Sequence, residues 1–149
     1  MPLVLRFIKD LAAYEKLLHE VTATEALLTK SLFGRTRVAE AIICENATGP
    51  VGFAVFFPTF STFLGKSGVY IEDLFVNPDQ RGHGYGRAML QHIANRVRQA
   101  NGKRLEWSVL NWNEPSIGFY KAIGAKPVDG WTKFRLDGQA LAKLGKKVA

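Results

Sequence analysis

The sequence predicts an α/β domain in which helices flank a mixed central β-sheet. Short stretches rich in β-branched and aromatic residues alternate with stretches whose apolar residues recur every three to four positions, which are the periods of strands and helices. Clusters of Gly, Pro and Asn separate these stretches. The 149 residues suffice for one hydrophobic core and are too few for two. We therefore expect a single domain over residues 1–149 with the order β-α-α-β-β-β-α-β-α-β.

The first part of the chain is expected to hold three strands and two helices. Asp10 is a suitable N-cap for a helix that runs to about Glu20, and Thr24 precedes a shorter helix that ends near Gly34. Residues 46–50 have the composition of a hairpin connection. The expected strands are 2–8, 37–45 and 51–57.

The rest of the chain contains the clearest strand and the clearest helix. Residues 69–76 are mostly β-branched or aromatic and end at the turn signal Asn77-Pro78. From Tyr85 the apolar residues recur every four positions, as in an amphipathic helix. Pro115 lies near the first turn of a later helix, and Gly124 lies just past its end. The remaining expected elements are strands at 103–110, at Val128 and at 131–136, and a short helix at 138–144.

Composition limits the class of partner without choosing one. The formal charge of +7 admits nucleic acid, an acidic membrane surface or a polyanionic small ligand. The basic residues are dispersed and form no recognisable nucleic-acid module, so we expect neither nucleic acid nor membrane as a partner. Cys44 is the only cysteine, which excludes a disulfide within the chain. The chain also lacks a long apolar run and a signal peptide's apolar region, so we expect a cytoplasmic protein.

A glycine-rich loop joins the strand 69–76 to the helix that follows it. Three glycines fall within five residues, between two arginines. Glycine lets backbone N–H groups approach a ligand, and a helix N-terminus attracts anions. The loop therefore suits a phosphate or pyrophosphate, although it matches neither the Walker A nor the G-x-G-x-x-G pattern, and a β–α turn without a ligand is the alternative. Its residues are Arg81, Gly82, His83, Gly84, Tyr85, Gly86 and Arg87.

Glu72 and Asp73 are adjacent carboxylates in an otherwise apolar strand. Ionised carboxylates are costly there unless they are solvated or paired. Because successive side chains of a strand point to opposite faces, at most one of the two is expected to enter a given cleft. The residues alone leave two interpretations open: strand-edge acids paired with arginines, or carboxylates that bind an ammonium group or accept its proton. The three histidines lack metal-ligand spacing, so we expect no metal ion.

Two motifs in this order resemble those of a known enzyme family. Arg81-x-x-Gly84-x-Gly86 resembles the acetyl-CoA pyrophosphate loop of the GNAT superfamily of N-acetyltransferases. About 30 residues later, Asn113-x-x-Ser116-x-x-Phe119-Tyr120 resembles the second cofactor-binding motif of these enzymes. The segments 70–76 and 112–121 resemble the branch that contains the spermidine/spermine (diamine) and thialysine acetyltransferases.

The resemblance implies an acetyl-CoA-dependent N-acetyltransferase that forms a homodimer. Tyr120 would protonate the departing CoA thiolate, and Glu72 would contact or deprotonate the amine. The strands near Phe75 and Val76 would have to splay to admit pantetheine, through a β-bulge. The implied cofactor-binding residues are Leu74, Phe75, Val76, the loop residues 81–87, Asn113, Pro115 and Ser116. The implied acceptor side comprises Glu72, Asp73, Glu106, Trp107 and Ser108.

The acceptor amine is less determined than the reaction. Polyamine-specific members that resemble this chain carry acidic residues after the second helix, whereas residues 29–37 here contain Lys30, Arg35 and Arg37 and no acid. A long polycation would be repelled there, so a smaller amine, such as an amino acid with a side-chain amine, is at least as well supported. An acetyltransferase acting on a protein amine, a non-catalytic CoA-binding module and a basic nucleic-acid-binding module stay open as alternatives.

Overall fold

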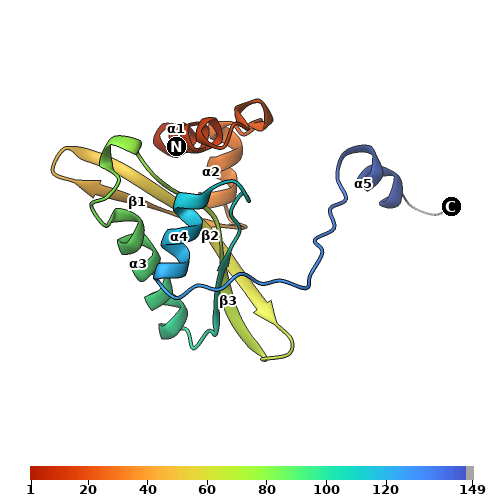
Figure 1. The fold of residues 1–149 in the computed structure, drawn as a ribbon. Coiled ribbons are helices and arrows are strands. Elements are labelled where there is room, and N and C mark those ends of the chain that lie inside the picture. The colour runs from red at the N-terminus through yellow and green to blue at the C-terminus, as the bar shows by residue number, and fades with distance from the viewer. Residues whose placement is uncertain (147–149) are drawn as a thin grey trace. The chain divides into compact units, whose positions relative to one another are not determined.

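The structure is a computed structural model that describes residues 1–146. These residues form two compact units, Met1–Leu110 and Asn111–Ala149, the second of which is described as far as Lys146. The first unit contains α1 (Pro2–Tyr14), a short 3-10 turn (Leu18–Glu20), α2 (Glu25–Phe33), β1 (Glu40–Asn46), β2 (Gly49–Ser61), β3 (Lys66–Val76), a second 3-10 turn (Pro78–Gln80), α3 (Tyr85–Gln99) and β4 (Arg104–Trp107) (Figure 1). The second contains α4 (Glu114–Ala122) and α5 (Gly138–Leu144). The single domain over residues 1–149 stays a prediction.

The sheet has the order β1-β2-β3-β4 and is mixed, as predicted. β2 pairs with β1 and with β3 in antiparallel ladders, and β3 pairs with β4 in a parallel one. The parallel pair follows from the crossover through α3, which lies between the two strands in the chain. This arrangement confirms the α/β class and the predicted succession, along the chain, of three strands, a helix and a fourth strand.

Helices cover the two faces of this sheet (Figure 1). On one face, Phe7 of α1 stacks on Phe53 with ring centroids 5.2 Å apart and meets Phe75 edge-on at 6.4 Å. On the other face, the Met89 side chain of α3 lies over Gly52, where an added Cβ would come within 3.3 Å of it. Phe7 and Phe53 are fully buried, so α1 and the two central strands form the main core.

The predicted strand at residues 2–8 is wrong, because α1 occupies this segment. Pro2 stands at the start of the helix, where its missing N–H costs nothing. Val4 and Phe7 are buried and Leu11 packs against the same core, a spacing of three and four residues that marks one helical face. Asp10 therefore lies inside the helix and is not an N-cap; its carboxylate is 3.9 Å from Arg6, one turn away.

The closing strands expected at Val128 and at 131–136 are also wrong, since residues 125–137 form no strand. A strand needs a neighbour for its backbone groups, and no described residue of the second unit belongs to a β-ladder. The spacing of the apolar residues is also unsuited to a strand with one buried face, because Trp131 and Phe134 are three residues apart and would face opposite sides. The short helix predicted at 138–144 is confirmed as α5.

The helix expected from Asp10 to about Glu20 is wrong in its bounds, because α1 ends at Tyr14 and only Leu18–Glu20 form a further 3-10 turn. The helices expected after Thr24, from Tyr85 and around Pro115 are confirmed, and some strands have shifted ends. Thr24 caps α2, as its hydroxyl oxygen accepts a 3.2 Å hydrogen bond from the Leu27 N–H. The strand expected at 103–110 is shorter and ends at Trp107. Along the described residues, no helix is both long enough and apolar enough to cross a membrane.

Candidate active site

A β-bulge at Glu72 shapes the middle of β3. In the antiparallel ladder Ile71 pairs with Phe56 and Asp73 pairs with Val55, so Glu72 is an additional residue with no partner of its own in the register. Tyr70 and Asp73 consequently lie on the same face, opposite Phe57 and Val55, although they are three residues apart. This is the face on which α1 packs.

The bulge corrects one expectation. A bulge was expected near Phe75 and Val76, but the register from Asp73 to Val76 is regular, because Phe75 is fixed in the core against Phe7 and opposite Phe53. The extra residue breaks the two-residue period between Tyr70 and Asp73. That at most one of Glu72 and Asp73 enters a given cleft stays a prediction.

The pairing of β3 with β4 ends where the bulge begins. Their parallel ladder ends at Ile71 opposite Trp107, so Leu74, Phe75 and Val76 lie beyond it. Ser108, the first residue after β4, still contacts β3, because its hydroxyl lies 2.6 Å from that of Tyr70. The edge of β3 that is not paired with β4 thus begins at Glu72, and the splaying of the strands near Phe75 and Val76 stays a prediction.

Asp73 carries an unusual charge environment. Burial, the neighbouring Glu72 and then Glu15 raise the pKa of Asp73 from 3.8 to about 6. Burial also raises the pKa of Glu15, which follows α1 directly. A carboxyl group that titrates just below neutral pH suits proton exchange with an amine. Sequence reasoning missed Glu15 as a member of this group, because only the packing of α1 brings it near β3.

Replacing Asp73 with asparagine is expected to stabilise the protein at pH 8 and to do so much less at pH 4. Because the folded-state pKa is above the unfolded value, the folded state holds the proton between about pH 4 and pH 6 after the unfolded state has lost it, so wild-type stability falls as pH rises through this window. The shift corresponds to about 1–3 kcal/mol at pH 8. Urea unfolding of both proteins at the two pH values measures it.

The exposed Asp10, whose carboxylate is 3.9 Å from Arg6, provides a matched control. Asp10→Asn is expected to change the free energy of unfolding by less than about 0.5 kcal/mol at either pH. A stability difference between Asp73→Asn and wild type that is the same at pH 4 and pH 8 contradicts the raised pKa.

The glycine loop ends in an open helix N-terminus. Gly84 is the N-cap of α3 with φ of +82°, and Gly82 has φ of +81°, a region that other residues adopt at a cost. The Ala88 N–H makes the first helical bond, to the Gly84 carbonyl at 2.9 Å, so the three N–H groups before it lie at the open end. A Cβ built on Gly82 or Gly84 meets no atom within 4 Å. This loop therefore leaves space for an anion beside exposed donors.

The Arg81 side chain turns back toward the core. Its Nε donates to the Val76 carbonyl at 3.1 Å, and its guanidinium lies 4.6 Å from the ring centroid of Tyr14 and 5.6 Å from that of Phe75. These contacts tie the start of the loop to α1 and β3. A direct contact of Arg81 with pyrophosphate stays a prediction, as does that of the exposed Arg87.

In the second unit, the residues of the second motif share one stripe of α4. Asn113 caps the helix, and its side-chain oxygen accepts a 3.4 Å hydrogen bond from the Ser116 N–H. Ser116 and Tyr120 are four residues apart, which places them on the same helical face as the cap. The Tyr120 ring lies 5.6 Å from that of Phe119, and Gly124 ends the helix with φ of +94°. The predicted positions of Pro115 and Gly124 are confirmed, and the cap by Asn113 is an additional finding.

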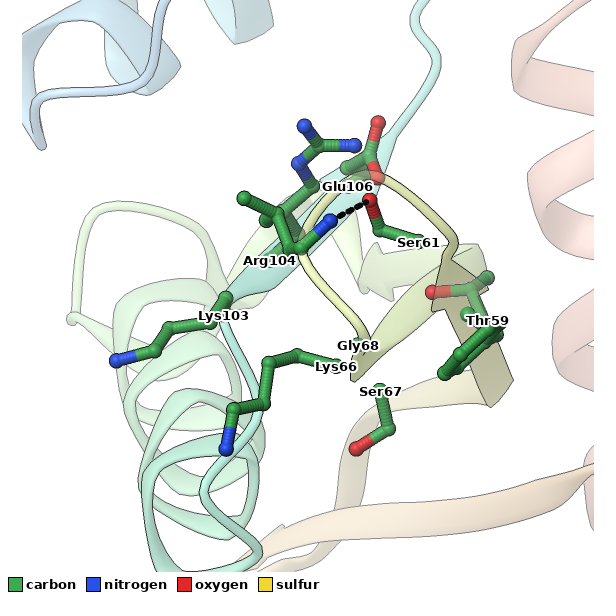
Figure 2. A pocket seen from close by; sticks show the side chains of 10 residues that line it. Thr59, Ser61, Lys66, Ser67, Gly68, Lys103, Arg104 and Glu106 are labelled. Carbon is green, nitrogen blue, oxygen red and sulfur yellow. Dashed lines mark hydrogen bonds between the residues drawn. The ribbon is translucent and has the colours of Figure 1, made fainter.

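A small cavity lies where the tip of the β2–β3 hairpin meets β4 (Figure 2). Its volume of about 40 Å³ holds a few water molecules and is too small for an acetyl-CoA arm. Glu106 and Ser61 line it, whereas the amino groups of Lys66 and Lys103 point away from Ser61 in Figure 2. The roles of Glu106 and of its neighbour Trp107 on the acceptor side stay predictions.

Comparisons with known proteins agree on one family. A profile of the "Acetyltransferase (GNAT) family" matches residues 9–125. Thialysine N-epsilon-acetyltransferase of Bos taurus is 32% identical, with 97% of this chain and 91% of the relative covered. L-ornithine N5-acetyltransferase of Arabidopsis thaliana is 28% identical, with coverage of 98% and 84%. A solved integron cassette protein of V. cholerae superimposes with a TM-score of 0.80 at 27% identity, with coverage of 97% and 90%.

The family match includes the bulged strand, the glycine loop and the capped helix of Tyr120, and the relatives match along nearly the whole chain. Both named relatives are acetyltransferases of small amines by their names. The chain therefore belongs to the GNAT family of N-acetyltransferases.

Proposed function

We propose that the protein transfers the acetyl group of acetyl-CoA directly to a primary amine of a small molecule. The observation that carries this proposal is the proximity, within one unit, of an open helix N-terminus and a strand edge that is not paired with β4 and carries two carboxylates. Gly84 and Gly86 belong to the first feature, and Glu72 and Asp73 to the second. An anion site and an amine site on consecutive elements suit a reaction between a CoA thioester and an ammonium substrate.

The reaction requires three things of this chain. Leu74, Phe75 and Val76 flank the pantetheine arm at the edge of β3 beyond β4, while the loop 81–87 binds the pyrophosphate. The ammonium form of the substrate loses one proton to Glu72 or Asp73, and the neutral amine attacks the thioester carbonyl, so that the C–N bond forms as the C–S bond breaks. Tyr120 gives its phenol proton to the departing thiolate, and the second proton, lost by the new amide nitrogen, restores the Tyr120 phenol. Asn113, Pro115 and Ser116 lie along the cofactor on the same helix as Tyr120.

The acceptor that we propose is an amino acid with a side-chain amine. Two relatives are named for thialysine and for ornithine, which are both of this class. Lys30, Arg35 and Arg37 are exposed at and after the end of α2, where they would repel a long polycation. A homodimer stays a prediction of the resemblance, and a cytoplasmic location stays a prediction of the composition.

A transfer assay tests the proposed function. Purified protein is given acetyl-CoA and, in separate reactions, thialysine, lysine, ornithine, a short diamine, spermidine and a lysine-containing peptide. Release of free CoA and the mass of the acetylated product are measured. We expect an amino acid to have a kcat/KM at least about tenfold above that of spermidine, an energy difference of about 1.4 kcal/mol. Acetylation of the peptide alone would instead identify a protein acetyltransferase. If no amine were acetylated, the proposed acetyl transfer would be contradicted.

Replacing Glu72 with glutamine is expected to lower kcat or raise the KM of the amine, while the Kd of acetyl-CoA stays within about twofold. Glutamine keeps the size of the exposed side chain at the bulge and removes only its charge. Steady-state kinetics and calorimetry with acetyl-CoA measure these quantities. The matched control is Glu45→Gln, in the exposed part of β1. If Glu72→Gln lost affinity for acetyl-CoA and kept that for the amine, Glu72 would belong to the cofactor side.

A further inference from the structure

A single side chain of β1, that of Asn46, contacts the residues on either side of Gly82 and Gly84 in the glycine loop. The Nδ2 group of Asn46 donates to the Gln80 Oε1 at 3.1 Å and to the Tyr85 hydroxyl at 3.1 Å. Gln80 is the last residue before the loop, and Tyr85 is the first residue of α3. Both contacts are partly buried and join residues at least 34 positions apart in the chain. Asn46 itself ends β1, at the turn before β2.

The hydrogen-bonding capacity of this amide is fully used. A primary amide has two N–H donors and two acceptor positions on its oxygen. The two donors are the contacts to Gln80 and Tyr85 described above. The Oδ1 atom accepts the Thr48 N–H at 2.8 Å and the Thr48 hydroxyl at 2.6 Å. Because the Thr48 N–H can only donate, the oxygen must face Thr48, and the two N–H groups must face the loop.

This network constrains a segment that would otherwise be flexible. Gly82 and Gly84, both with positive φ, lie between the two contacts, and glycine has the largest conformational freedom of any residue. A contact within the loop constrains it further, because the Nδ1 atom of His83 lies 3.1 Å from the Gln80 carbonyl oxygen. Fixing residues 80 and 85 on one rigid turn reduces the number of loop conformations before any ligand binds.

We propose that Asn46 is a positioning residue for the cofactor: its amide preorganises the glycine loop for the pyrophosphate of acetyl-CoA. This inference rests on the proposed function, because it presumes that the loop binds that group. Asn46 does not touch the ligand in this proposal; it acts through Gln80 and Tyr85. Its loss should therefore weaken binding of the pyrophosphate part of the substrate and leave the chemistry of acetyl transfer unchanged.

Asn46→Ala is the variant that tests this role. It removes both N–H donors to Gln80 and Tyr85 and introduces no polar or charged group that could replace them. We expect the Kd of acetyl-CoA to rise about tenfold to thirtyfold, the effect of losing two partly buried hydrogen bonds. With acetyl-pantetheine, which lacks the pyrophosphate, we expect kcat/KM to stay within about twofold of wild type.

Thr48→Val is the matched control, because it removes the hydroxyl bond to the Asn46 oxygen in the β1–β2 turn and keeps both Asn46 donors. We expect its Kd of acetyl-CoA to stay within about twofold of wild type. Should Asn46→Ala fail to fold, Tyr85→Phe provides the test. It removes one acceptor and keeps the ring, and we expect a twofold to fivefold rise in the Kd of acetyl-CoA, roughly half the free-energy effect.

An unchanged Kd of acetyl-CoA in the folded Asn46→Ala protein overturns the proposal. Equal losses with acetyl-CoA and acetyl-pantetheine overturn it as well, because they indicate a general structural role. If the wild-type protein bound no acetyl-CoA, the proposed function on which the inference rests would be contradicted. This outcome is measured before any variant is made.

Discussion

Replacing Tyr120 with phenylalanine is expected to lower kcat by about tenfold to a thousandfold, the contribution of one general acid or one donor to a developing anion. Phenylalanine keeps the ring that lies 5.6 Å from Phe119 and removes only the hydroxyl. The KM of acetyl-CoA should change little, because the thioester of the ground state gains less from this donor than the departing thiolate does. Single-turnover measurements of CoA release, in which chemistry limits the rate, give the relevant constant.

The control for this prediction is Tyr14→Phe. It removes a phenol from α1 but keeps the ring over which Arg81 lies, so we expect kcat to stay within about twofold. If Tyr120→Phe had the same single-turnover rate as wild type, the proton would have to come from another donor, and Tyr120 would be an aromatic packing residue.

Local signals sufficed for the parts of the fold that the site needs. The β-branched run of β3, the four-residue period of α3 and the cap of α4 each reflect interactions between residues close in sequence. The positive φ angles of Gly82 and Gly84 fit the same kind of signal, because few other residues adopt them.

The errors arose where distant contacts decide the conformation. Residues 2–8 have a composition that suits a strand, yet they are helical, because the helix buries Phe7 between Phe53 and Phe75. The position of the bulge depends in the same way on which residues of β2 and β3 pair. The sequence does not show which strands pair or in which register, so it predicts neither the helix at residues 2–8 nor the position of the bulge.

The same reasoning explains which site residues could not be found from sequence. The raised pKa of Asp73 depends first on burial and then on Glu72 and Glu15, and only Glu72 is its neighbour in sequence. Asn46 lies 34 residues before Gln80, in a turn that sequence analysis assigns only to a hairpin. Motif resemblance could assign roles to residues that touch the cofactor, but not to side chains that position them from another strand.

Gly86→Val is expected to raise the Kd of acetyl-CoA by at least about a hundredfold while the protein stays folded. The loop donates backbone N–H groups to a charged pyrophosphate in our proposal, and each charge-assisted bond of this kind contributes about 1.5–3 kcal/mol. Two methyl groups on the Cβ of residue 86 would occupy the space through which the phosphate oxygens approach. Calorimetric titration with acetyl-CoA gives the Kd, and thermal unfolding shows whether the variant is folded.

Position 86 makes a cleaner test than position 84. Gly84 has φ of +82°, so valine there would strain the backbone by about 1–2 kcal/mol whatever the ligand does. Gly86 is inside the first turn of α3, and a Cβ at this position meets only the Val76 Cγ2, at an ordinary 3.9 Å. Valine also has a slightly better helix propensity than glycine, so the melting temperature without ligand should change by only a few degrees.

Gly86→Ala is the matched control, because one methyl group fits the observed space. We expect its Kd to lie within about threefold of wild type. The comparison of the two variants separates the size of the side chain from the loss of glycine itself. A folded Gly86→Val protein that binds acetyl-CoA as tightly as Gly86→Ala does would mean that the pyrophosphate lies elsewhere, because no phosphate can contact these N–H groups past a branched side chain.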